Sequence, residues 1–131
     1  MSDAPADRRT PSGPDGPLDL GAAGQRLLDE ARDKSSGRAA RTLTPGAHAT
    51  LSQTLVALRA GVVLDEHQAN GPATIQVLQG TATMSSGAGA VELVGGQWAA
   101  IPAARHDLRA DDDTVALITV APTAGPQGRD G

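Results

Sequence analysis

The sequence contains no cysteine, phenylalanine or tyrosine, and Trp98 is its single aromatic residue. Without cysteine, a disulfide framework, a thiolate zinc site and an iron–sulfur cluster are excluded. No run of 18 or more apolar residues is present, which excludes a membrane span of ordinary length. The first residues do not follow the pattern of a secretory signal, so we expect a cytoplasmic protein. The core must be built from valine, leucine, isoleucine and alanine.

Basic residues are few and scattered along the chain. The 131 residues include 11 lysines and arginines against 15 aspartates and glutamates, for a formal net charge of −4. Binding to nucleic acid needs a clustered basic face, and Arg8-Arg9 is the only adjacent basic pair. We therefore expect neither nucleic acid nor a membrane as a partner. The length fits one domain.

Composition divides the chain into four segments. Residues 1–17 hold four prolines and little apolar material, and with residues 122–131 they are predicted to be a disordered leader and tail. Residues 18–38 repeat apolar side chains at steps of three and four, which predicts an amphipathic helix. We expect Asp19 in its first turn and a stop at Ser35-Ser36-Gly37.

The fourth segment, residues 41–121, consists of short apolar or β-branched runs separated by turn residues. This pattern indicates an antiparallel sandwich or barrel. Because no run in this segment has helical length, a sheet with crossover helices is disfavoured. The predicted strands are residues 50–60, 62–64, 73–79, 81–84, 91–94, 97–101, 106–109 and 114–121.

Two motifs inside this segment are similar to the two motifs of the cupin superfamily. Gly61, His67 after a spacer of five residues, and Gly80 a further 13 residues along resemble the first motif, which carries two histidines and a glutamate. Gly96, the proline at 102 and His106 resemble the second, which contains a histidine and ends in an asparagine. The resemblance implies an all-β fold, a single cupin-like β-barrel or jelly roll with one N-terminal helix.

We expect this protein to form a homodimer. A small barrel with an amphipathic helix and open sheet edges gains most when a second copy covers those edges. The resemblance implies the same, because small cupins often pair.

The chain departs from the cupin motifs where they bind metal. In the family pattern, three histidines and the glutamate hold a divalent ion, whereas here Ala69 replaces one histidine and Ala73 (or Thr74, with a longer spacer) replaces the glutamate. His67 and His106 remain as candidate ligands for Fe, Mn, Ni or Zn. A catalytic site usually needs three protein ligands, so two imidazoles alone would bind a metal weakly.

Strand alternation predicts the surroundings of the two histidines. If Ala73 faces the interior, Ile75 and Val77 do so too, and with Ala69 they line an apolar pocket. Gln76 is a candidate third ligand, although alternation turns it outward unless a bulge shifts the phase.

Three other features suit structural roles. Trp98 is predicted to lie in the core or in an interface rather than to stack on a ligand. The three aspartates at 111–113 are predicted to form a solvated turn, and His48 fits an exposed residue at the entry of a strand.

Three functions remain open. The first is a non-catalytic or weakly metal-dependent protein that binds a small apolar or aromatic molecule between His67 and His106. The second is a metal-dependent oxygenase or isomerase that uses the same histidines, with water or Gln76 completing the metal shell. The third is a structural, dimerising module whose barrel is filled by its own side chains. The high ratio of arginine to lysine and the abundant alanine, glycine and aspartate are typical of the coding bias of high-GC bacteria.

Overall fold

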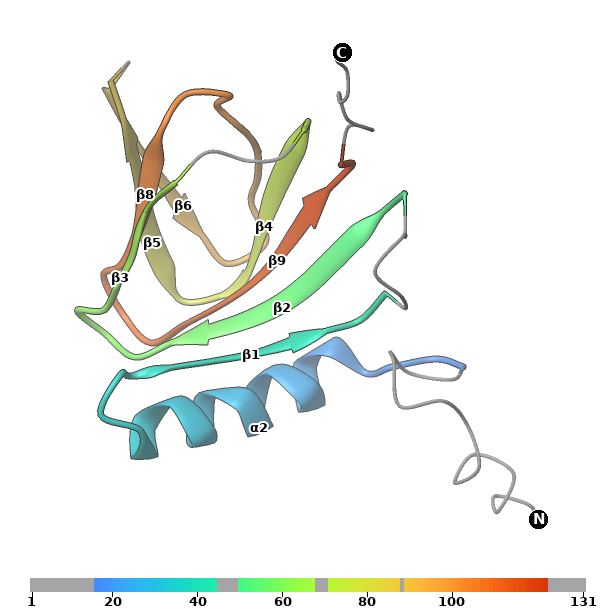
Figure 1. Cartoon of the computed structure of the whole chain (residues 1–131). Helices are drawn as coiled ribbons and strands as arrows, with labels where there is room; N and C mark the ends of the chain where they lie inside the picture. The colour runs from blue at the N-terminus through green and yellow to red at the C-terminus, as the bar shows by residue number, and fades with distance from the viewer. Residues whose placement is uncertain (1–15, 45–49, 68–70, 88, 123–131) are drawn as a thin grey trace.

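The computed structural model describes residues 16–44, 50–67, 71–87 and 89–122, with the backbone alone at residues 65–67. These residues form one helix and nine strands (Figure 1). The helix is too short to span a bilayer. The elements are α2 (Leu20–Asp33), β1 (Arg38–Thr42), β2 (Ser52–Leu58), β3 (Val63–His67), β4 (Ala73–Gln79), β5 (Thr81–Ser86), β6 (Gly89–Val94), β7 (Trp98–Ile101), β8 (His106–Ala110) and β9 (Thr114–Val120).

Helix α2 is shorter than the predicted segment 18–38 at both ends. Asp19 is the N-cap rather than a first-turn residue, because its Oδ1 accepts a hydrogen bond from the Ala22 N–H at 3.0 Å. The helix ends at Asp33 because Lys34 adopts an extended backbone conformation. The prediction was therefore wrong beyond this point, where Arg38 already begins the first strand.

One face of α2 packs against the outer face of the sheet that contains β1, β2 and β9 (Figure 1). The approach is close at Gly24, where an added Cβ would lie 2.7 Å from Cγ1 of Val115. Burial of the apolar side chains on this face of α2 supplies the stability that an isolated helix of this length lacks. The buried side chains of this cluster come from Ala23, Leu27, Leu28, Ala31, Ala39, Leu55, Ala57 and Val115.

The nine strands form two antiparallel sheets that face each other. The first has the order β1-β2-β9-β4-β7 and the second β3-β8-β5-β6. No strand pairing joins the two sheets among the described residues, so the jelly roll is not closed into a continuous barrel. The predicted all-β class with one N-terminal helix is confirmed.

The eight predicted strands correspond to β2 through β9, and β4 has the predicted bounds of residues 73–79. Strand β1 was missed, because Arg38–Thr42 lacks an apolar alternation that could be recognised. Its Ala39 is buried beneath α2, and all five of its residues pair with β2, from Arg38 with Leu58 to Thr42 with Thr54. Tertiary contacts, rather than local preference, make this segment a strand.

The core between the sheets is aliphatic, as the lack of aromatic residues requires. The chain fills this space with small and branched side chains from both sheets and with a single methionine. The buried members are Val56, Leu58, Ile75, Val77, Ala82, Met84, Leu93, Leu108, Ala110 and Ala116.

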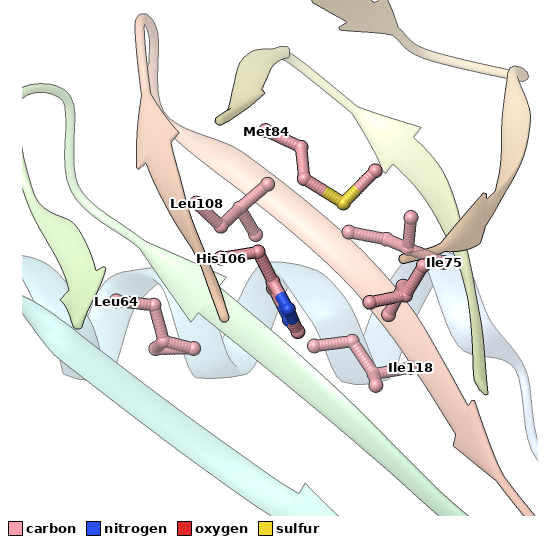
Figure 2. Close-up of a pocket in the computed structure, with 7 residues that line it drawn as sticks. Leu64, Ile75, Met84, His106, Leu108 and Ile118 are labelled. Carbon is pink, nitrogen blue, oxygen red and sulfur yellow. The ribbon is translucent and has the colours of Figure 1, made fainter. Parts of the chain in front are cut away.

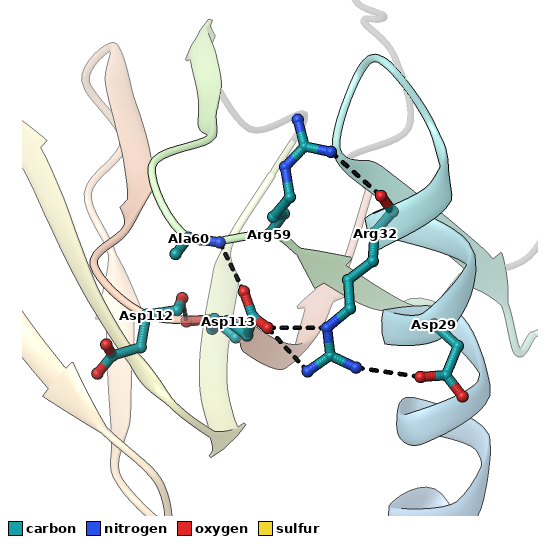
Figure 3. A network of polar contacts seen from close by, with 7 residues as sticks. Asp29, Arg32, Arg59, Ala60, Asp112 and Asp113 are labelled. Carbon is teal, nitrogen blue, oxygen red and sulfur yellow. Dashed lines mark hydrogen bonds and ion pairs between the residues drawn. The ribbon is translucent and has the colours of Figure 1, made fainter.

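A polar network joins the end of α2 to two turns of the sandwich (Figure 3). Asp113 accepts a hydrogen bond from the Ala60 N–H at 2.8 Å through Oδ1, and its Oδ2 lies 2.9 Å from Nε of Arg32. Arg59 donates from Nη1 to the carbonyl oxygens of Lys34 at 3.0 Å and of Arg32 at 3.3 Å, and the Arg32 carbonyl is one of the last in the helix. The Ala60 N–H, followed by Arg32, holds the pKa of Asp113 below its usual range.

The three aspartates 111–113 form a turn, as predicted, and their side chains serve different partners. Asp111 accepts from the Thr83 hydroxyl at 2.6 Å and from Nε of Arg109 at 3.0 Å. Those two bonds, with Thr83 the stronger influence, lower the pKa of Asp111. The acids therefore brace the turn and do not converge on one point.

Candidate functional site

A small pocket lies between the two sheets, and its volume is about 30 Å³. This is room for about two water molecules, since one needs roughly 10–15 Å³. Six strands contribute to the lining, so the pocket belongs to the sandwich as a whole (Figure 2). The lining residues are Leu64, Ile75, Met84, Ile101, His106, Leu108 and Ile118.

His106 is the polar member of this lining. His106 is the first residue of β8 and is 5% exposed. Its side chain extends among the aliphatic side chains of the pocket (Figure 2). Nδ1 of the ring lies 3.1 Å from the carbonyl oxygen of Ala104. Because a carbonyl oxygen can only accept, Nδ1 is the donor in this bond. This bond orients the imidazole, which carries the only side-chain polar atoms of the pocket lining.

The histidines of the two motifs occupy opposing positions on neighbouring strands. The register of β3 and β8 pairs His67 with His106, after an irregularity that follows Leu64. The backbone thus brings together two positions that are distant in the sequence. The side chain of His67 is not among the described parts, so its role as a ligand stays a prediction.

The predicted alternation of β4 is present in the structure. Ala73, Ile75 and Val77 are buried, whereas Gln76 is exposed on the other face of the sheet. Of these residues, Ile75 lines the pocket. Val77 belongs to the packed core, and Gln76 points away from His106.

The remaining pocket residues were not identified from the sequence. Leu108 could have been found, because it follows His106 by two residues on the same strand and so shares its face. Met84, Ile101 and Ile118 could not, because their contribution depends on how the two sheets face each other. Ala69 and His48 lie outside the described residues.

The described side chains do not fit a three-ligand metal site. No group of three or more histidine, aspartate or glutamate residues that could hold an ion is present among them. Beside His106 the pocket offers only leucine, isoleucine and methionine side chains. Ala73, which the motif resemblance places at the glutamate position (or Thr74, with the longer spacer), has no donor atom in its side chain.

Trp98 is 61% exposed, so the prediction of a core position was wrong and the interface alternative stays open. It lies on β7 opposite Gln76, outside the pocket. The physical reason is that α2 covers β1, β2 and β9 but leaves this end of the sheet uncovered.

The similarity of this chain to known proteins was found by comparing structures. No protein-family model matches the chain, and no curated protein matches its sequence. A cupin superfamily protein from Desulfitobacterium hafniense has a TM-score of 0.61 at 17% identity, covering 66% of this chain and 78% of that one. A sugar phosphate isomerase of the cupin superfamily from Silicibacter pomeroyi has a TM-score of 0.56 at 25% identity, covering 74% and 65%.

A larger enzyme is similar over more of the chain. Salicylate 1,2-dioxygenase from Pseudaminobacter salicylatoxidans has a TM-score of 0.70 at 17% identity, and the match covers 92% of this chain but 39% of the enzyme. Identities this low establish the fold alone, and the neighbours differ in activity. The fold of this chain is that of a small cupin domain.

Proposed function

We propose that this chain is a small-molecule-binding cupin domain whose ligand occupies the pocket around His106. The observation that supports this proposal is one buried imidazole, oriented by the Ala104 carbonyl, within an otherwise aliphatic lining. Apolar walls with a single polar group suit a ligand that has an apolar body and one hydroxyl group. A phenol or a short alcohol has this chemistry.

The single polar group sets the expected selectivity. A ligand hydroxyl that donates to Nε2 of His106 contributes about 0.5–1.5 kcal/mol net, which corresponds to roughly a 2- to 10-fold preference over a hydrocarbon of the same shape. A sugar or a phosphate would leave several polar groups without partners, at about 1–3 kcal/mol each. Such ligands are disfavoured in this pocket.

The pocket volume sets the expected size of the ligand. At about 30 Å³, the space accepts a hydroxyl group and one or two carbons without rearrangement. A larger body would require movement of Met84, whose unbranched side chain adapts more readily than its branched neighbours. We therefore expect weak binding of phenol by the native chain.

Thermal unfolding in the presence of phenol or toluene tests the proposal. At ten times its Kd, a ligand stabilises the folded state by about 1.4 kcal/mol, which raises the Tm by roughly 5–10 °C for a domain of this size. We expect phenol to stabilise the chain at lower concentration than toluene. His106→Leu should remove this preference, and Gln76→Leu, on the opposite face of the sheet, should preserve it. If neither compound stabilises the native chain, the proposal fails and a filled structural module is favoured.

A metal-dependent enzyme is the second candidate, and the pairing of His67 with His106 in the strand register favours it. Dioxygenase and isomerase activities occur among proteins of similar fold. Metal analysis and titration with Fe²⁺, Mn²⁺, Ni²⁺ and Zn²⁺, on protein prepared without an affinity tag, separate the two candidates. Uptake of one equivalent that disappears in the His67→Ala/His106→Ala double variant would favour the enzyme. Uptake far below one equivalent favours the binding protein.

A further inference from the structure

The exposed Trp98 lies on a part of the sheet that no described element covers. Strand β7 is the outermost strand of its sheet, and α2 packs on the opposite end of the same face. Trp98 is the only aromatic residue of the chain and is 61% exposed. A large apolar side chain on an open sheet edge is a common feature of interaction surfaces.

The hydrogen bonds of β7 show which of its backbone groups are used. The Val77 N–H donates to the Gln97 carbonyl at 2.9 Å, and the next pair in the register is Gln76 with Trp98. In an antiparallel ladder, bonded and non-bonded pairs alternate. Gln76 and Trp98 therefore form a non-bonded pair, and the N–H and C=O of Trp98 point away from β4.

The same alternation applies two residues further along the strand. Ala100 pairs with Thr74, so its N–H and C=O also point away from β4. Among the residues that the structure describes, no hydrogen bond outside the ladder engages these groups. The free edge of β7 thus presents two donors and two acceptors, at Trp98 and Ala100.

Strand β7 and its neighbours carry no charge. No Asp, Glu, Lys, Arg or His occurs in β4, β7 or β9, although 20% of the chain is charged. Natural edge strands are usually protected by short length, charges, proline or bulges; β7 is short, with four residues, but it contains no charge, proline or bulge. A charge-free edge suits a partner that presents the same surface, because identical charges would otherwise meet across a two-fold axis.

We propose that β7 pairs in antiparallel fashion with β7 of a second copy of this chain, about a two-fold axis at Ala99. In this register, Trp98 of each copy forms a bonded pair with Ala100 of the other. The outward groups of both strands are then all used. The methyl group of Ala100 leaves space for the indole ring of the second copy on the shared outer face.

The size of this contact indicates a reversible dimer. Each tryptophan can bury about 150–250 Å², and β7 contributes only Trp98–Ile101. Such a contact falls at the small end of specific interfaces, below roughly 1,200 Å² in total, where association is transient. We expect a Kd on the order of micromolar.

The intrinsic fluorescence of Trp98 gives a direct test, because the chain has no other tryptophan and no tyrosine. As the protein concentration rises through the Kd, the emission maximum should shift to the blue while sedimentation equilibrium shows a dimer. Ala100→Lys should weaken association at least 100-fold and keep the emission red-shifted. Val63→Lys places the same charge on β3, an edge strand of the other sheet, where Val63 is 38% exposed, and should leave both readouts unchanged.

Three outcomes would overturn this interface: a monomer throughout the concentration range, a dimer whose Trp98 emission stays red-shifted, or an Ala100→Lys dimer as strong as the native one. Circular dichroism confirms that each variant is folded. If Ala100→Lys does not fold, Trp98→Ala, followed by sedimentation alone, should lower the association constant by a similar factor, and unchanged association would overturn the proposal.

Discussion

Replacement of Asp113 should weaken the attachment of helix α2 to the sandwich. The carboxylate accepts from the Ala60 N–H at 2.8 Å and from Nε and Nη2 of Arg32 at 2.9 and 2.8 Å. Asp113→Ala removes all of these bonds, whereas Asp113→Asn keeps an oxygen that can accept from Ala60 and loses the charge (Figure 3).

The magnitude follows from the exposure of this network. A hydrogen bond to a charged group contributes about 1.5–3 kcal/mol when buried, but the Asp113 side chain is 31% exposed and solvent screens the ion pair. We therefore expect Asp113→Ala to lower the free energy of unfolding by about 1–3 kcal/mol, and Asp113→Asn by about 1 kcal/mol. Each kcal/mol lowers the Tm by roughly 4–8 °C.

The effect of Asp113 should depend on pH in a defined direction. Its pKa is lower in the folded state than in the unfolded chain, where it is about 3.9. The carboxylate thus stabilises the fold above that value, and this contribution is lost as the pH falls through the lower, folded-state pKa. The difference between the native chain and Asp113→Asn should be constant from about pH 5 to 8 and shrink in acid.

Urea unfolding at pH 7 and at a series of acidic pH values measures this difference. Asp112→Asn is the matched control, because Asp112 is exposed in the same turn, and it should change the stability by less than about 0.5 kcal/mol. Equal stabilities of Asp113→Asn and the native chain at pH 7, or a difference that persists undiminished in acid, would refute the reasoning.

Two further predictions concern packing. Met84→Ala enlarges the pocket, so urea unfolding should show a free energy of unfolding that is lower by about 2–5 kcal/mol. Calorimetric titration should show that this variant nevertheless binds phenol more tightly than the native chain. Weaker phenol binding would mean that the ligand binds elsewhere. Gly24→Ala should cost about 1–3 kcal/mol, because the new Cβ would lie 2.7 Å from Val115, whereas Gly21→Ala at the start of the helix serves as a comparison without a core contact. Equal melting temperatures for the two glycine variants would show that α2 packs less closely than described.

The fold could be predicted wherever a local pattern determined the structure. The alternation of β4 placed Ile75 inside and Gln76 outside, and the turn residues marked most strand boundaries. Strand β1 could not be predicted in this way, because Arg38–Thr42 becomes a strand through its pairing with β2 and its cover by α2.

The candidate site was predictable in part for a related reason. The motif spacing identified His106, and alternation identified Ile75, but Met84 and Ile118 reach the pocket from strands whose positions depend on the sheet order. The exposure of Trp98 depends on which strands α2 packs against, and β7 is not one of them. No local pattern in the sequence contains that information.

The proposed ligand site can be tested most directly by NMR on protein with ¹⁵N-labelled histidine. The chain has three histidines, so the ring resonances of His106 can be assigned by their loss in His106→Leu. We predict that added phenol moves the Nε2 resonance of His106 in a saturable way, while Nδ1 stays protonated on the Ala104 carbonyl. A ring whose resonances do not respond to phenol, in a chain that remains folded, would contradict the assignment of this pocket as a binding site.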